Sequence, residues 1–138
     1  MAVDVKEIII KGKERDLKLA QQLRKDFIDK YNNQEAFEGL LQHFQPNCED
    51  KLIHRLKTEE TIDFYKDYAA LKEIASKVSK AHYKELFLYV CEEDEARVWI
   101  NDNGKYEGMV FNALYRSFRN QPELQKYIKP KKNRTSMI

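Results

Sequence analysis

Glycine and proline are scarce in this chain, and their scarcity limits the accessible folds more than any other feature. Only four Gly and three Pro occur among 138 residues. These two residue types mark most turns, so a fold of many short strands and tight turns lacks the residues that it needs. The chain is therefore expected to form long helices, and its length suits one domain with an ordinary core.

Apolar residues recur at helical spacing over most of the sequence. Between residues 14 and 31, apolar side chains return every three or four positions, which gives a helix one apolar stripe. Similar stripes follow, and Pro122 is typical of a new helix start. The pattern predicts five to six helices, over residues 14–31, 33–44, 47–56, 58–80, 106–118 and 122–128.

Three short stretches predict β-strands. Residues 3–10 include Ile8, Ile9 and Ile10, and a run of β-branched residues favours an extended chain. Residues 86–91 and 96–100 are apolar runs whose lengths suit a hairpin. Because three strands are unstable alone in water, helices should cover one face. The predicted fold is a helix-rich α+β domain with a three-stranded sheet, compact over residues 1–130 and followed by a flexible basic tail, 131–138.

Two polar clusters near the predicted hairpin invite a metal-site interpretation. Residues 92–95 are four consecutive carboxylates, but consecutive strand residues point to opposite faces and do not converge on a cation. Residues 101–104 resemble part of a calcium loop, yet the alignment places Trp99 and Val110 where acidic ligands are required. The sequence therefore favours a hairpin tip at 92–95 and a turn at 101–104.

Histidine and cysteine positions offer a second metal hypothesis. His43, Cys48 and His54 follow the pattern His-x4-Cys-x5-His, which could supply three zinc ligands. Structural zinc usually takes four ligands, and Cys91 could complete the set only through the tertiary fold. We therefore expect two reduced cysteines and no bound metal.

Charge is distributed unevenly along the chain. From residue 111 onward, seven basic residues oppose the single acid Glu123, whereas residues 1–110 hold 18 basic and 22 acidic residues. A basic segment of this kind is typical of a contact surface for phosphate groups. The candidate residues for an anionic partner are Arg116, Arg119, Lys126, Lys129, Lys131, Lys132 and Arg134.

Signals for catalysis are weak throughout the sequence. It contains no Gly-x-Ser-x-Gly, no phosphate-binding glycine loop and no His-Glu-x-x-His. We therefore expect a small non-enzymatic regulatory or adaptor protein without a cofactor, which binds a protein partner or a second copy of itself. The alternatives are a nucleic-acid-binding protein that uses the basic C-terminal segment and an enzyme with a non-local Cys/His or carboxylate site.

The same sequence features give an expectation for location. No apolar run reaches the roughly 18 to 20 residues that span a bilayer. Two cysteines cannot form a disulfide-dense scaffold of the kind found in small secreted domains. A cytoplasmic protein that does not enter a membrane is expected.

Overall fold

Helices dominate the computed structural model, which describes residues 3–44, 47–81, 83–102 and 105–130. The helical fraction is 74%, which confirms the predicted helix-rich α+β character. The described elements are α1 (Glu14–Tyr31), α2 (Gln34–Gln42), α3 (Cys48–Glu59), β1 (Thr61–Ile62), α4 (Phe64–Ala81), α5 (Tyr83–Cys91), α6 (Ala96–Asp102), α7 (Glu107–Arg119), the 3-10 helix η1 (Pro122–Tyr127) and β2 (Ile128–Lys129).

The sheet in the described residues differs from the predicted one. It is a two-stranded antiparallel pair in which Thr61 of β1 faces Lys129 of β2. The predicted hairpin strands at 86–91 and 96–100 are wrong, since these residues lie in α5 and α6. The buried side chains of α5 fall at helical spacing, at Leu86, Phe87, Val90 and Cys91.

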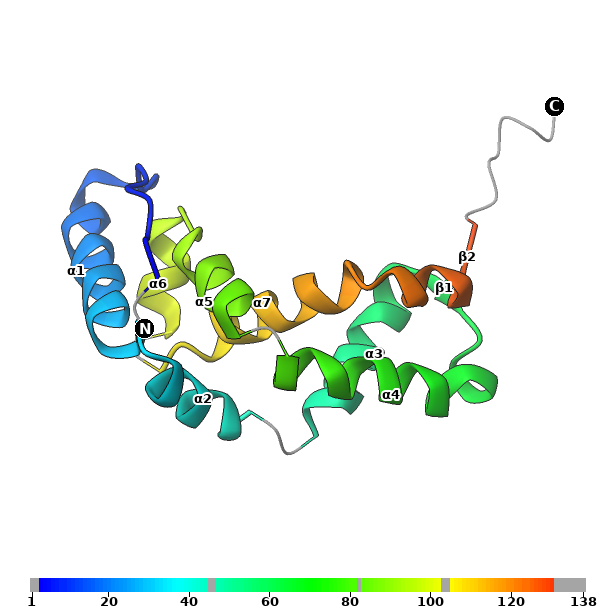
Figure 1. The fold of residues 1–138 in the computed structure, drawn as a ribbon. Helices are drawn as coiled ribbons and strands as arrows, with labels where there is room; N and C mark the ends of the chain where they lie inside the picture. The colour runs from blue at the N-terminus through cyan, green and yellow to red at the C-terminus, as the bar shows by residue number, and fades with distance from the viewer. Residues whose placement is uncertain (1–2, 45–46, 82, 103–104, 131–138) are drawn as a thin grey trace, which may run out of the picture.

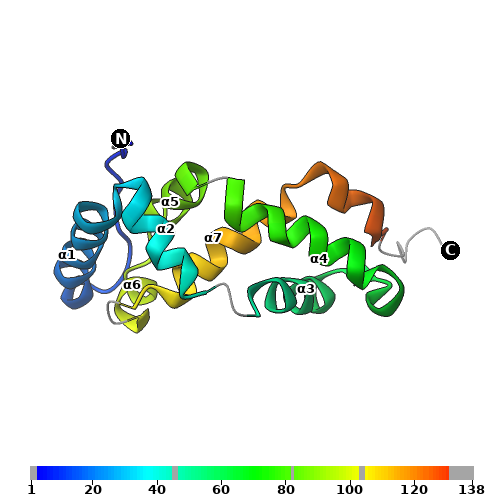
Figure 2. The same ribbon diagram turned by 60° about the horizontal axis from the view of Figure 1, so that its bottom comes forward.

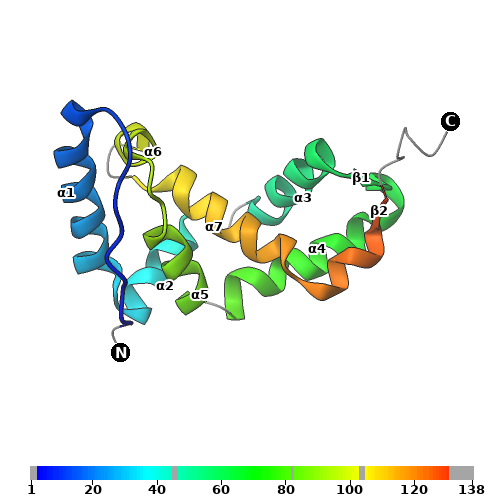
Figure 3. The same cartoon turned by 90° about the horizontal axis from the view of Figure 1, so that it is seen from above.

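The predicted N-terminal strand is extended but belongs to no sheet. Residues 3–10 have no regular secondary structure, and Lys11 forms one isolated parallel bridge with Glu95. Helix α1 and the short connection from α5 to α6 lie beside this segment, so it lacks a neighbouring strand to pair with. Figure 3 shows it running between α1 and the connection from α5 to α6. Residues 3–11 are called the N-terminal segment below.

Helix α7 joins two groups of helices. Figures 1 and 2 show the N-terminal segment, α1, α2, α5 and α6 around one end of α7, and α3, α4 and η1 around the other. Most of α7 is therefore buried, through Met109, Val110, Ala113, Leu114, Tyr115, Ser117 and Phe118. Whether residues 1–130 unfold as one domain stays a prediction, and the predicted tail at 131–138 lies outside the described residues.

An aromatic cluster forms the core of the first group. The ring of Phe27 stacks on Phe87 at 5.5 Å between centroids and meets Tyr106 edge-on at 4.9 Å. Phe37 and Trp99 complete the contacts around Phe27, at 6.3 and 6.0 Å. Offset-stacked and edge-to-face rings add to the free energy gained by burying them. The cluster fixes α1, α2, α5, α6 and the start of α7 against each other.

Within the described residues, no helix combines the length and the apolar character required to cross a bilayer.

Candidate functional site

The N-terminal segment is held at three points. At its start, the Asn32 side chain pairs with the Val3 backbone through two hydrogen bonds, of 2.7 and 2.8 Å. At its end, Lys11 N–H donates to Asp94 O at 2.6 Å, and Lys11 O accepts from Ala96 N–H at 2.8 Å. Between these points, Arg24 donates to Lys6 O at 3.0 Å. The segment is therefore fixed in an extended conformation across the first group of helices.

Arg24 is the central anchor of this arrangement. Its side chain comes from α1 and is buried, and its Nε donates to Cys91 O at 2.9 Å. Cys91 ends α5, where carbonyl groups lack helical partners and a positive charge is favoured. The Arg24 guanidinium thus joins α1, the end of α5 and the N-terminal segment. The two carbonyl oxygens that it contacts provide the buried positive charge with hydrogen-bond partners.

The backbone between these anchors is unpaired. Among the described residues, no hydrogen-bond partner is found for the backbone groups of Glu7, Ile8, Ile9 and Ile10. Ile10 is buried and Ile8 half-buried, whereas Ile9 is 84% exposed. An extended run of β-branched residues with free N–H and C=O groups has the properties of a sheet edge that lacks its neighbour.

A groove of about 560 Å³ separates this segment from α1. Four of its lining residues are apolar, and Arg24 lies on its inner wall. Two acids and two bases line it, so the groove carries no net charge. The lining residues are Val5, Glu7, Ile8 and Ile10 from the segment, and Gln21, Arg24, Lys25, Ile28 and Asp29 from α1.

The acidic block at 92–95 connects α5 to α6, so the predicted hairpin tip is wrong. Its carboxylates point to different partners: Glu92 binds Arg116 at 2.6 Å and Asp94 binds Lys11 at 3.5 Å. The Glu93 carbonyl accepts a hydrogen bond from Trp99 Nε1 at 2.9 Å. This connection supports the N-terminal segment. Of the predicted turn at 101–104, residues 101 and 102 end α6, and the other two lie outside the described residues.

The two predicted cysteines are free thiols buried in the fold, whereas His43 and His54 are exposed. Burial raises the pKa of Cys48 to about 11 and that of Cys91 to about 12, so both thiols stay protonated near neutral pH. The ring of His54 packs against Phe64 at 5.1 Å. Within the described ranges, no three metal-binding side chains come close enough to hold an ion. Elemental analysis of the purified protein is the test of the metal-free prediction.

The two predicted arginines of α7 contact different elements. Arg116 binds Glu92 and lies over the Tyr89 ring at 3.9 Å from its centroid. Arg119 binds Glu60, just after α3, at 3.1 Å. Exposed Lys126 and Lys129 form no ion pair with a described residue, whereas Lys131, Lys132 and Arg134 lie outside the described residues. The anionic-partner surface stays a prediction.

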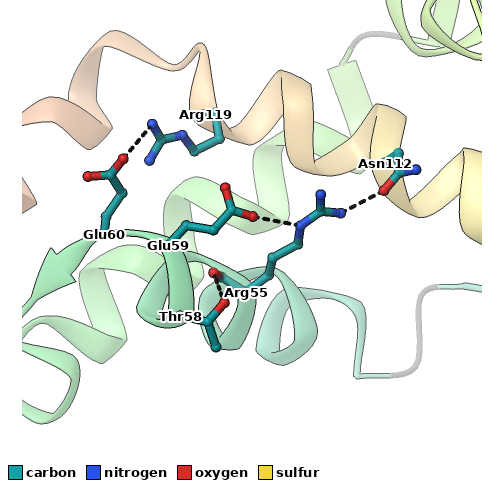
Figure 4. A network of polar contacts seen from close by, with 6 residues as sticks. All are labelled: Arg55, Thr58, Glu59, Glu60, Asn112 and Arg119. Carbon is teal, nitrogen blue, oxygen red and sulfur yellow. Dashed lines mark hydrogen bonds and ion pairs between the residues drawn. The ribbon is translucent and has the colours of Figure 1, made fainter.

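A polar network joins α3 to α7 in the second group. Figure 4 shows Arg55 between Glu59, at 2.9 Å, and Asn112, at 2.6 Å, and its guanidinium lies 4.4 Å from the Tyr115 ring centroid. Burial, with Glu59 nearby, raises the pKa of Tyr115 to about 12. Because each charged member has a partner, this network fits a structural role.

Comparison with models of known protein families, with curated proteins and with solved structures found no match to this chain.

The groove was not predicted from the sequence, although one signal pointed toward it. The Ile8–Ile10 triplet indicated an extended segment, but the absence of a strand beside it depends on the tertiary fold. Arg24 falls on the apolar stripe of residues 14–31, four positions after Ala20 and three before Phe27, but its partners could not be read from the sequence.

Proposed function

We propose that this chain is a non-catalytic protein-binding module, of the regulatory or adaptor kind. In this proposal it holds an extended segment of its partner in the groove between the N-terminal segment and α1. The observation that carries the proposal is the unpaired backbone of residues 7–10 beside a groove whose lining is part apolar and part polar. Addition of a strand to an exposed edge is a common mode of peptide recognition.

The positions of the anchors indicate which backbone groups face the groove. In an extended chain, adjacent residues present their N–H and C=O groups to opposite edges. Lys11 bonds toward the connection between α5 and α6, whereas Lys6 O bonds toward Arg24 on α1. In the proposal this alternation holds between Lys6 and Lys11, so that Ile8 and Ile10 direct their groups toward α1; Val3, which bonds Asn32 at the end of α1, lies before this stretch. A partner strand in the groove would pair with four backbone groups from these two residues.

The expected affinity follows from these four hydrogen bonds. At about 0.5 to 1.5 kcal/mol each, they contribute about 2 to 6 kcal/mol. Apolar side chains of the partner that alternate toward Ile8, Ile10 and Ile28 add the free energy of burial. The three anchors hold the segment extended before binding, so little ordering cost falls on this chain. Together these contributions predict dissociation constants of roughly micromolar size.

Selection from a random heptapeptide library, followed by amide hydrogen exchange, tests the proposal. Selected peptides should carry apolar β-branched residues at alternate positions and no proline between them. Binding should slow exchange at the Ile8 and Ile10 amides and leave Ile9 nearly unchanged, since its N–H faces the other edge. Peptides that protect only α3 or α4 would contradict the proposal.

Proline substitution provides a matched pair of variants. Ile8→Pro removes an N–H that faces the groove, whereas Ile9→Pro removes one that faces away. The first variant should lose most peptide affinity and the second should retain much of it, with melting curves used to confirm folding. Equal losses in two folded variants would show that the groove edge is not the binding element.

The two other functions expected from the sequence stay as alternatives. Contact with nucleic acid is favoured by the basic C-terminal segment, in which Lys126 and Lys129 are exposed. The protonated state of Cys48 and Cys91 near neutral pH disfavours a thiol nucleophile.

A further inference from the structure

A second groove, of about 740 Å³, is lined by residues from the end of α2, the start of α3 and the N-terminal part of α7. Its volume is within the range of sites that hold small molecules. It shares no residue with the groove beside the N-terminal segment. The lining residues are Tyr31, Leu40, His43, Phe44, Lys51, Lys105, Glu107, Gly108 and Phe111.

Three aromatic side chains from three parts of the fold line this groove. Tyr31 ends α1, Phe44 follows α2 and Phe111 belongs to α7. Each is half-buried, so part of each ring packs on the core while part stays accessible. Tyr31 is braced edge-on against Tyr106 at 5.8 Å between ring centroids. Lys30 lies over the Tyr31 ring at 5.3 Å from its centroid and Arg55 over the Phe111 ring at 5.7 Å, so a planar ring would stack on the parts of these rings that stay accessible.

Two positively charged side chains without ion pairs to described residues also line this groove. Lys51 and Lys105 are exposed, and neither forms an ion pair with a described residue. The His43 imidazole is also exposed, and Glu107 is the one acid in the lining. Two free ammonium groups beside an aromatic surface suit a ligand with a planar ring and a negatively charged group.

The start of α7 does not supply the anion contact. Its Gly108 and Met109 amides each donate to the Asp102 carboxylate at 3.1 Å, so these first-turn donors are occupied. The charge of Asp102 is balanced locally by these amides. Recognition of an anionic group therefore falls to the Lys51 and Lys105 side chains, which are long enough to adjust to its position.

We propose that this groove binds a nucleotide unit, with the base against Tyr31, Phe44 and Phe111 and the phosphate near Lys51 and Lys105. The unit can be a free mononucleotide or one nucleotide of a single strand, since both present a planar base and a phosphate. The site is separate from the groove between the N-terminal segment and α1, and from the basic C-terminal segment.

Amide chemical shifts of the full chain, followed during titration, test this proposal. The probes are AMP, UMP, an eight-residue oligouridylate and inorganic phosphate. Shifts should concentrate at the lining residues for nucleotide probes and be much weaker for phosphate. Saturation by AMP or UMP identifies a free nucleotide as the source, and saturation by the octamer alone identifies a single strand. No shift at the lining residues with any probe, or equal binding of phosphate, overturns the proposal.

Matched variants separate this site from general charge attraction. Lys51→Glu with Lys105→Glu should weaken nucleotide binding at least tenfold. Lys66→Glu with Lys84→Glu makes the same charge change at exposed positions outside the groove and should weaken it less than twofold. Phe111→Leu keeps an apolar side chain without a ring and should weaken binding about tenfold with the fold intact. Equal effects of the two charge pairs overturn the proposal.

Discussion

Replacement of Arg24 with Met removes the two hydrogen bonds that join α1 to Cys91 O and Lys6 O, at 2.9 and 3.0 Å. Hydrogen bonds from a charged donor contribute about 1.5 to 3 kcal/mol each. Met fills the volume of the arginine stem without a charge that must be desolvated, which offsets part of the loss. The free energy of unfolding should therefore fall by about 2 to 3 kcal/mol.

Thermal and urea denaturation, followed by circular dichroism, measure this change. For a chain of this length, such a loss lowers the melting temperature by about 10 °C. Arg15→Met is the matched control, because the Arg15 side chain is 72% exposed. Its effect should stay within about 0.5 kcal/mol. If Arg24→Met and Arg15→Met melt at the same temperature, the reasoning about the buried anchor is refuted.

The remaining predictions concern helix content, thiol ionisation and the basic end. The far-UV spectrum should show about 74% helix, and a β-dominated spectrum would contradict the fold. Stability against urea should fall as pH rises from about 9 to about 11. Cys48 and Cys91 ionise near pH 9 when unfolded but at about 11 and about 12 when folded, so a double alanine variant should show a smaller fall. Deletion of residues 131–138 should lower the salt concentration that elutes the chain from heparin, because it removes three basic side chains. An unchanged elution would count against the basic end as an anion contact.

The sequence predicted helices best where polar and apolar residues alternate at helical spacing. Residues 14–31 have such a stripe, and α1 has these same bounds. Residues 86–91 are apolar on every side, and a short run of this kind fits a strand or a buried helix equally well. Their neighbours decide the outcome: Phe87 packs on Phe27 and Phe37, which lie 60 and 50 positions away in the sequence.

The candidate site was harder to predict because its parts are distant in the sequence. Arg24 reaches the carbonyl of Cys91, 67 positions away, and no local pattern marks that pairing. The β-branched side chains of residues 8–10 did predict an extended chain there. The lack of a neighbouring strand could not be predicted, because it follows from α5 and α6 being helices. The error in the hairpin prediction therefore also concealed the unpaired edge.

The position of α7 between the two helix groups has a consequence for synthesis of the chain. The described residues between 14 and 102 form six helices, and α7 follows them at residues 107–119. While a ribosome makes the chain, these earlier helices emerge before α7, which packs against α3, α4, α5 and α6. Each helix group therefore lacks its packing against α7 until that helix has been synthesised. Nascent chains that end before residue 107 should bind chaperones more strongly than chains that extend past residue 119.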